Sequence, residues 1–239
     1  MKKLFLLSLI LFLLGNSYAQ NKTLTIYYTD STKIINMANV DSMSIFICGV
    51  NKINYAGQYY NTVEIGNQCW LKENLNLGTT LTRYQNQSDN GIIEKWCYDD
   101  LQSNCTTYGG LYSWYETMQY VYTSGGKGIC PTGWHIPTIN DFLVLKSAVN
   151  NDGNTLKRDD QGVGGGIGTN TSGFSGLMAG YRSNSSSYGS LSYECFIWTS
   201  EPANQSFSNY LFLGYQSSEI FINNGHYKAN GLSVRCIKN

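Results

Sequence analysis

Seven cysteines constrain the fold of this 239-residue chain more than any other feature of its sequence. They are Cys48, Cys69, Cys97, Cys105, Cys130, Cys195 and Cys236. No two are spaced C-x-x-C, so neither a zinc-knuckle nor a thioredoxin-like motif is present. Six can pair and one is left over. Spacing alone does not give the connectivity, although the short polar loop between Cys97 and Cys105 suits a local disulfide.

The N-terminus indicates the compartment in which these cysteines reside. Lys2 and Lys3 precede an apolar run over residues 4–14, and the small residues Ser17 and Ala19 follow. This pattern predicts a signal peptide over residues 1–19, cleaved after Ala19. The run is shorter than the roughly 20 residues that span a bilayer, and no later segment is apolar enough to do so. We therefore expect a secreted or cell-surface protein without a transmembrane segment, in which disulfides persist.

The charge of the mature chain excludes one large class of partners. Loss of Lys2 and Lys3 leaves fourteen basic residues against the sixteen acidic ones. Without a basic excess to neutralise phosphates, nucleic-acid binding is not expected. Aromatic residues make up 14% of the chain, which favours a folded domain over a disordered polymer.

The pattern of apolar residues divides the chain into an extension and a main domain. Short β-prone runs near residues 24–28, 33–35 and 43–48 predict a small β-rich extension over residues 20–50. The polar stretch 49–60 is the expected boundary. The main domain, residues 60–239, opens with two short apolar runs joined by Gly66 and Asn67, a pair typical of a two-residue hairpin turn.

Two helices are expected among many short strands in the main domain. One covers about residues 110–119. The other begins at Thr138, where Thr138 and Asp141 fit a capping box ahead of an apolar stripe. Short turn-punctuated strands without a βαβ rhythm predict an α+β domain of antiparallel strands, stabilised by disulfides.

Candidate catalytic and metal-ligating residues are few. His135 and His226 are the two histidines, and we expect the His135 imidazole to anchor a turn by hydrogen bonds rather than to catalyse a reaction. The carboxylates of Asp152, Asp159 and Asp160 are weak candidates for calcium, since their spacing does not match an EF-hand loop. No other cofactor is expected, and the glycine-rich segment 162–168 lacks a phosphate-loop motif and predicts a flexible surface loop.

Aromatic side chains in polar loops are the clearest binding signal. Exposed tyrosines beside Asn and Ser are typical of surfaces that recognise sugars and proteins. The candidate ligand-binding residues are Tyr181, Arg182, Tyr188, Tyr193 and Asn204. We expect loops near residues 150–195 and 200–230 to carry this function.

Several ordered motifs resemble one family. Residues 63–75 (VEIGNQCWLKENL) resemble its "V-x-I-G-x-Q-x-W-[ML]-x-x-N-L" opening, residues 130–138 (CPTGWHIPT) match its "C-P-x-G-W-H-[LI]-P-[TS]" signature, and residues 233–236 (SVRC) follow in the expected place. Over about residues 60–239 the chain is thereby identified as a member of the Fibrobacter succinogenes major paralogous domain family. This family is exported and is similar to the sulfatase-modifying-factor branch of the C-type-lectin-like fold.

The resemblance also allows two functional motifs to be tested. Formylglycine-generating enzymes need two copper-binding cysteines just upstream of the final motif, and residues 223–234 contain none. Activity of that kind is therefore not expected, and no catalytic residue is assigned. Residues 201–204 (EPAN) resemble the "E-P-N" sugar motif of calcium-dependent lectins, but one inserted residue would misplace the Asn204 oxygen relative to the metal.

The resemblance sorts the cysteines. It implies the pairs Cys97–Cys105 and Cys130–Cys236. Cys69 and Cys195 stand where the family has other residues, and we hypothesise that they form a third disulfide, which leaves Cys48 unpaired.

Three functions follow as hypotheses. The first is a non-catalytic module that binds a glycan or protein ligand. The second is an enzyme with an unrecognised site, around His135. The third is a structural envelope protein, whose Cys48 would form intermolecular disulfides.

Overall fold

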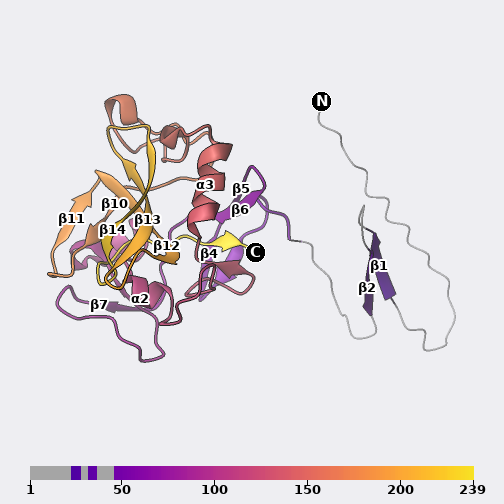
Figure 1. Ribbon diagram of the computed structural model, residues 1–239, viewed down its shortest axis with the longest axis horizontal. Coiled ribbons are helices and arrows are strands. Elements are labelled where there is room, and N and C mark those ends of the chain that lie inside the picture. The colour runs from indigo at the N-terminus through magenta and orange to yellow at the C-terminus, as the bar shows by residue number, and fades with distance from the viewer. Residues whose placement is uncertain (1–22, 28–31, 37–45) are drawn as a thin grey trace. The chain divides into compact units, whose positions relative to one another are not determined.

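The structure, a computed structural model, describes residues 23–27, 32–36 and 46–239 (Figure 1). The chain divides between residues 45 and 46 into two units. The signal peptide expected over residues 1–19 lies outside the described residues, as do residues 43–45 of an expected strand. No helix in the described ranges is long and apolar enough to cross a bilayer.

The first unit contains an antiparallel hairpin of β1 (Thr23–Tyr27) and β2 (Thr32–Asn36). Thr23 pairs with Asn36 and Tyr27 with Thr32. The hairpin confirms two of the three strands expected in the extension. The third was expected over 43–48, and residues 46–48 form no strand.

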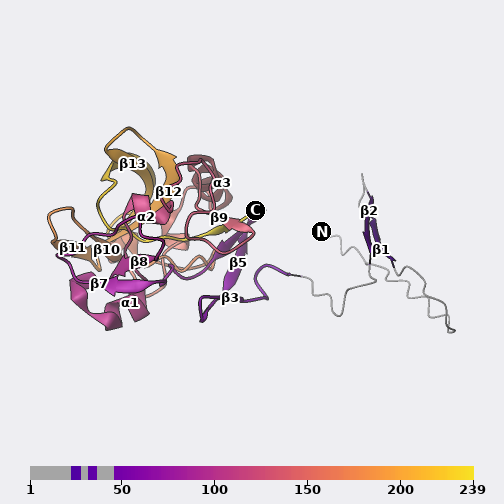
Figure 2. The same ribbon diagram turned by 90° about the horizontal axis from the view of Figure 1, so that it is seen from below.

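A four-stranded sheet joins the two ends of the second unit. Its order is β5 (Thr62–Ile65), β6 (Gln68–Leu71), β15 (Ile237–Lys238) and β9 (Trp134–His135). β5 and β6 form the hairpin expected around Gly66, which has a φ of +64°. The C-terminal strand, drawn in yellow, lies between β6 and β9 (Figures 1 and 2).

The longest strands form a second sheet. β12 (Glu194–Pro202), β13 (Phe207–Gly214) and β14 (Ile220–Tyr227) run antiparallel in that order. Three two-stranded pairs complete the unit: β3 (Ile53–Tyr55) with β4 (Gln58–Tyr60), β7 (Thr79–Leu81) with β8 (Glu94–Trp96), and β10 (Ala179–Arg182) with β11 (Tyr188–Leu191).

The described residues contain three short α-helices, one more than expected: α1 (Gln102–Tyr108), α2 (Trp114–Thr117) and α3 (Ile139–Ala148). α3 confirms the capping box, because Thr138 Oγ1 accepts from the Asp141 amide at 3.1 Å and Asp141 Oδ2 accepts from the Thr138 amide at 2.8 Å. Short 3₁₀ turns are η1 (Tyr98–Asp100), η2 (Gly153–Thr155) and η3 (Gly164–Gly166).

The helix expected over 110–119 was wrong in extent. Leu111 and Tyr112 instead form β-bridges with Trp96 and Leu232, so helical geometry begins only at Trp114. α1 was missed because its residues are mostly polar and because it begins between Cys97 and Cys105, where a loop was expected. The fold is mostly β with a few short helices, in agreement with the α+β class.

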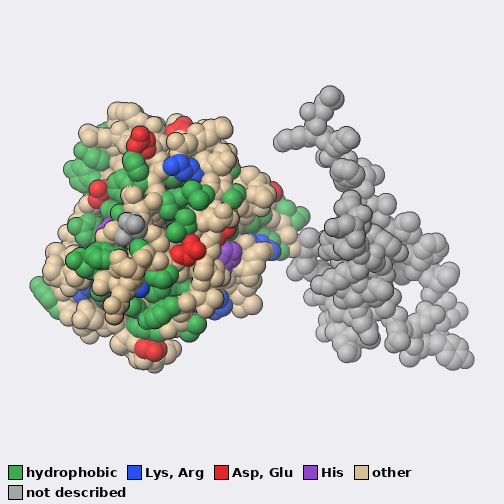
Figure 3. Space-filling view, in the orientation of Figure 1, with side chains coloured by type: hydrophobic (Ala, Val, Ile, Leu, Met, Phe, Trp, Pro, Cys, Tyr) green, Lys and Arg blue, Asp and Glu red, His purple; other side chains and the backbone are tan. Residues whose placement is uncertain are grey.

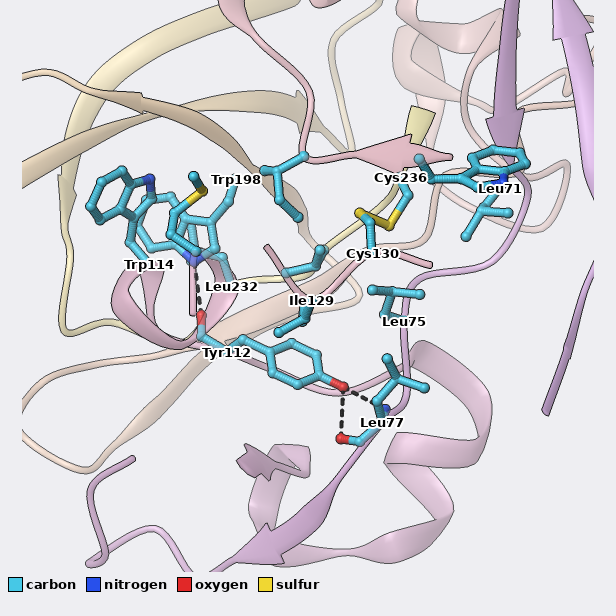
Figure 4. Packing of buried hydrophobic residues seen from close by; sticks show 14 of the residues in the cluster. Leu71, Leu75, Leu77, Tyr112, Trp114, Ile129, Cys130, Trp198, Leu232 and Cys236 are labelled. Atoms are coloured by element: carbon cyan, nitrogen blue, oxygen red, sulfur yellow. Dashed lines mark hydrogen bonds between the residues drawn. A yellow bond between two sulfur atoms is a disulfide. The ribbon is translucent and has the colours of Figure 1, made fainter. Parts of the chain in front are cut away.

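Two hydrophobic clusters make up most of the core. In the first, Trp114 and Trp198 pack with Tyr112 and the Cys130–Cys236 disulfide (Figure 4). The Trp198 indole donates to the Tyr112 carbonyl at 2.8 Å, and the Tyr112 hydroxyl donates to the Leu77 carbonyl at 3.0 Å. In the second cluster, Phe142 of α3 stacks on Trp70 of β6 at 5.6 Å between ring centroids.

The disulfides agree with two pairs and correct the third. Cys97–Cys105 and Cys130–Cys236 are the pairs that the family resemblance implies. The hypothesised bridge of Cys69 to Cys195 was wrong, because Cys69 bonds to Cys48 and Cys195 is a free, buried thiol. Successive residues of a strand face opposite sides. Trp70 contributes to the same cluster as Cys195, so its neighbour Cys69 faces away from that cluster.

Candidate functional site

The principal hollow of the second unit is a polar cleft of about 400 Å³. One wall is formed by β4 and Asn61, and another by residues 72–76 that follow β6. Residues 105–109, at the end of α1, close the third side. The Cys97–Cys105 disulfide and the left-handed Gly109, at φ +86°, fix this third side. A Cβ at Gly109 would lie 2.7 Å from the Asn74 Cβ, so only glycine permits this approach.

Strand alternation gives the two tyrosines of β4 different environments. Tyr60 is buried, and its hydroxyl accepts from the Asn76 amide at 3.1 Å. Burial raises the pKa of Tyr60 to about 12. Tyr59 faces the other way with 68% of its surface exposed, and Tyr108 of α1 also lines the cleft. The cleft therefore has an aromatic ring at its rim that no packing role explains.

Charged side chains of both signs line the same cleft. The Glu73 carboxylate accepts from the backbone amide and the side-chain amide of Asn61, at 2.8 and 2.6 Å. Lys72 and Arg158 supply positive charge, and Arg158 is paired with Asp160 at 2.5 Å. Carboxylate, amide and ammonium groups thus surround a space large enough for a small ligand.

A buried guanidinium lies directly behind the cleft. Arg235 has no exposed surface, and its Nε and Nη2 donate to the Asn74 side-chain oxygen at 3.2 and 2.8 Å. Its Cζ lies 4.3 Å from the centroid of the Phe174 ring. Burial lowers the pKa of Arg235 to about 10, which leaves it charged at neutral pH. Asn74, which lines the cleft, therefore lies between the cleft and the fixed positive charge of Arg235.

His135 has the structural contacts expected of it. Its Nδ1 lies 2.7 Å from the side-chain oxygen of Asn239 and its Nε2 lies 3.2 Å from Asp141 Oδ2. The hydrogen bond with Asp141 raises the pKa of His135. The imidazole thus joins β9 to the start of α3 and to the C-terminus, and it lines none of the three main hollows of the described chain.

The structure separates the other histidine from any polar site. His226 lies on β14 among the rings of Tyr181, Phe196, Trp198 and Tyr210, with centroids 4.6–6.2 Å away. Burial lowers its pKa to about 4, so the imidazole is neutral at physiological pH. Residues 223–225 (NNG) have the composition of a polar turn, but β14 continues through them to Tyr227.

The five predicted ligand-binding residues do not form one site. Tyr181 packs between Phe196 and His226, and Tyr193 packs edge-on against Tyr215 with 53% of its surface exposed. Tyr188 stacks near Tyr98 and donates to Asp100 at 2.9 Å. Of the remaining two, Arg182 is buried and lines a separate, smaller hollow.

Asn204 completes a turn. Its side-chain oxygen accepts from the amides of Ser206 and Phe207, both at 2.9 Å. The Glu201 carboxylate accepts from the amide of Ile139 at 2.6 Å and from Ser124 at 2.9 Å. Hydrogen bonds within the protein therefore occupy the side chains of both Glu201 and Asn204.

Two of the three acidic residues named as calcium candidates have other partners, whereas Asp159 forms no ion pair or side-chain hydrogen bond with the described residues. Asp152 accepts from the Asn154 amide at 2.9 Å as the cap of η2, and Asp160 pairs with Arg158. In the described ranges, no group of three or more His, Cys, Asp or Glu side chains is arranged to hold a metal ion. The same region contains a buried cation of the protein itself, since the Lys157 ammonium donates to four oxygens.

Residues 58–60 of the cleft were missed in the sequence because they lie in the stretch interpreted as a domain boundary. The doublet Tyr59-Tyr60 was the available signal. Two adjacent tyrosines on a short strand must face opposite sides, so one of them is exposed unless a second layer covers it.

The family expectation is confirmed by comparison with known proteins. A model described as the Fibrobacter succinogenes major domain (Fib_succ_major) matches residues 63–238, and the chain belongs to this family. No curated protein and no solved structure matches the chain. The matched range begins in β5 and ends in β15, the first and the last strand of the four-stranded sheet in chain order.

Proposed function

We propose that this protein is an exported, non-catalytic binding module that holds a saccharide in the cleft beside Tyr59. The observation that carries the proposal is the exposed Tyr59 ring at the rim of a cleft lined by Asn, Glu, Lys and Arg. An aromatic face stacks on the apolar face of a sugar ring, while amides and charged groups hydrogen bond with its hydroxyls. The three disulfides are compatible with an extracellular location.

The scaffold that we propose is C-type-lectin-like. Its support is the ordered set of motifs, the sheet that joins the first and last strands of the domain, and the Cys130–Cys236 disulfide close to that junction. The cleft is formed by residues 58–61, 72–76 and 105–109, together with Arg158, Ser175 and Leu177 from the region 150–195 that the sequence favoured. No residue of the second favoured region, 200–230, lines it.

The surface in Figure 3 is also suited to a neutral ligand. Charged side chains on this face are few and scattered among polar and hydrophobic ones. Such a surface offers no extended field to attract a strongly charged polymer.

The other two hypotheses have less support. The His135 imidazole has partners on both nitrogens and lines no main hollow of the described chain, so no observation favours an enzyme centred on it. Cys48 is bonded to Cys69 within the chain, which removes the thiol required for intermolecular disulfides.

A glycan array probed with the mature protein, with and without Ca²⁺, tests the proposal. We expect binding to a subset of saccharides, and at least about fivefold weaker binding by Tyr59→Ala, if stacking of a sugar ring is worth as much as the about 1–3 kcal/mol of a base on an aromatic side chain. Tyr84→Ala is the matched control, since Tyr84 is 81% exposed and lines none of the three hollows. A blank array, or equal binding by both variants, would overturn the proposal, and a pull-down from a surface extract would then test a protein ligand.

A further inference from the structure

A second, smaller hollow contains an unusual buried cation. It has a volume of about 160 Å³, and its lining includes Asn86, Trp96, Tyr115, Arg182, Asn184 and Ala229. Only 1% of the Arg182 surface is exposed. Its guanidinium carbon lies 4.0 Å from the centroid of the Trp96 ring. The stacked ring holds the planar guanidinium in one orientation at the wall of the hollow.

The charge of the Arg182 guanidinium has no ion-pair partner among the described residues. Its Nη2 donates to the carbonyl of Arg83 and to Ser186 Oγ, which are neutral acceptors. Its Nε is a buried donor without a partner. The carboxylate of Asp100, on the neighbouring η1, is taken by Arg83 and Tyr188.

Such an arrangement is costly unless something else supplies negative charge. An isolated buried charge without a partner loses its hydration, and a buried donor without an acceptor adds a further penalty. Burial accordingly lowers the pKa of Arg182. By contrast, the half-buried Arg83 has two acidic neighbours, Asp99 and Asp100. Among the described residues, the buried arginine therefore lacks the ion pairs that the more exposed arginine has.

We propose that the hollow beside Arg182 binds an oxyanion group, a carboxylate or a sulfate, carried by a ligand. The hollow is smaller than the roughly 300 Å³ of typical small-molecule sites, so it accommodates a functional group rather than a whole sugar ring or peptide. Guanidinium is the side chain best matched to planar or tetrahedral oxyanions. The exposed Asn86 and Asn184 stand at the rim, where their amides can donate to the same group.

This site is separate from the cleft beside Tyr59, and the two share no lining residue. The proposal therefore goes beyond the proposed function and does not depend on it. The Tyr59→Ala variant is expected to lose saccharide binding but to keep the oxyanion site. The Arg182→Gln variant is expected to lose oxyanion binding but to keep the cleft beside Tyr59.

Titration calorimetry of the mature protein tests the proposal directly. The probes are sodium sulfate and sodium glucuronate, with glucose as the neutral analogue and sodium chloride at matched ionic strength. We expect saturable binding of sulfate, glucuronate or both, and none of glucose or chloride. Binding of sodium sulfate shows that the hollow accepts a sulfate group, and binding of sodium glucuronate shows that it accepts a carboxylate. Absence of saturable binding by both oxyanions would overturn the proposal.

Variants locate the binding. Arg182→Gln is expected to weaken it at least tenfold, whereas Lys127→Gln, which removes the charge of an exposed lysine elsewhere, leaves it unchanged. Equal binding by these two variants contradicts the proposal.

Arg182→Gln removes a buried side chain, and a failure to fold would also abolish binding. A second pair of variants, at an exposed position, keeps the test independent of folding. Ala229 is exposed at the edge of the hollow. Ala229→Asp supplies a tethered carboxylate and is expected to abolish binding of the free anion and to raise the Tm at low salt. Ala229→Asn, of the same shape but neutral, is expected to do neither. Identical behaviour of the Asp and Asn variants would show that the hollow does not respond to negative charge.

Discussion

The Nε2 atom of His135 lies 3.2 Å from Oδ2 of Asp141, the same carboxylate oxygen that accepts the Thr138 amide in the capping box of α3. One carboxylate therefore begins the helix and holds the imidazole of β9. Burial acts to raise the pKa of Asp141, but hydrogen bonds from His135 and Thr138 outweigh it and the pKa falls below its usual value. The pKa of His135 is raised by the same contact.

This pair predicts a pH window of added stability. A raised His135 pKa gives stability that is complete below the usual value of 6.5 and is lost as pH rises through the folded value. A lowered Asp141 pKa gives stability that is present above 3.8 and is lost as pH falls through the folded value. The contact is therefore strongest between these limits. We expect His135→Asn to lower the free energy of unfolding by about 1 kcal/mol at pH 5.5 and by less at pH 8, measured by urea unfolding.

Asp141→Asn provides the comparison for this prediction. It removes the charge but leaves an oxygen for the Thr138 amide, so the cap is weakened while the ion pair is abolished. In the Asp141→Asn background, His135→Asn should lower the free energy of unfolding by the same amount at pH 5.5 and at pH 8. A His135 effect that does not change between pH 5.5 and 8 in the wild-type chain would contradict the ion pair.

Local patterns in the sequence predicted those parts of the fold that short-range interactions decide. The hairpin at Gly66 and the capping box of Thr138 and Asp141 depend on neighbouring residues, and both are present. The helix expected from residue 110 failed because Leu111 and Tyr112 gain long-range β-bridges, with Trp96 and Leu232, that no local pattern reveals. Cys48 and Cys69 were assigned incorrectly for a similar reason, since the path of the chain before β3 decides which thiols meet.

The candidate sites were harder to predict than the fold. Arg182 was named as a ligand residue, but the sequence does not show that it is buried without a carboxylate. The cleft residues come from segments 58–61, 72–76 and 105–109 and from three residues of the region 158–177, and their convergence depends on Gly109 and on the Cys97–Cys105 disulfide. Only the exposed Tyr59 had a signal in the sequence, as one half of a tyrosine doublet.

His226 predicts a pH dependence in the acid range. Burial lowers its folded pKa to about 4, against 6.5 in the unfolded chain. A lowered histidine pKa gives stability that is present above 6.5 and is lost as pH falls, because the unfolded chain takes up the proton first. The loss between pH 6.5 and 4 amounts to about 3 kcal/mol.

The variant His226→Phe tests this dependence. A phenyl ring fits among Phe196 and Tyr210, although the Asn230 amide loses its acceptor. We expect a lower stability at pH 7 and a flatter profile from pH 6.5 to 4, measured by thermal unfolding at several pH values. A profile as steep as that of the wild-type chain would exclude His226 as its cause.

The disulfide connectivity predicts a distinct pattern of thiol reactivity. Burial raises the pKa of Cys195 to about 11, and the side chain has only 1% of its surface exposed. Both effects keep the reactive thiolate scarce. We expect one alkylated cysteine per chain in denaturant, identified as Cys195 by mass mapping, and none in the native protein. A peptide that joins Cys69 to Cys195 would contradict this connectivity.

The three disulfides should differ in their contribution to stability. Cys130–Cys236 closes a separation of 106 residues, and Cys48–Cys69 closes one of 21. In the chain-entropy model a long loop gives about 4.7 kcal/mol and a loop of this shorter length about 3 kcal/mol. We expect the double variant Cys130→Ala/Cys236→Ala to lose more stability than Cys48→Ala/Cys69→Ala, measured by guanidinium unfolding. Equal losses would show that strain or packing, rather than loop closure, decides the effect.

Lys157 is a buried charged group whose replacement should lower stability. It has no exposed surface, and its ammonium donates to Asn154 Oδ1 at 2.9 Å and to the carbonyls of Gly166, Gly214 and Ser217 at 2.6, 2.9 and 2.6 Å. These contacts fasten the glycine-rich segment 162–168 to the end of β13, where the sequence predicted a flexible loop.

Replacement of Lys157 by Met keeps the aliphatic stem but leaves these buried oxygens without a donor. Each such group costs about 1–3 kcal/mol, and partial solvation of the exposed loop reduces the sum. We therefore expect Lys157→Met to lower the free energy of unfolding by about 3 kcal/mol in urea. Lys146→Met is the control, because the half-buried Lys146 donates only to the Ile220 carbonyl, at 2.8 Å, and its loss should cost about 1 kcal/mol. Equal costs for the two lysines would mean that the carbonyls around Lys157 find water as readily as the one beside Lys146, and the ammonium would then not be what holds the loop.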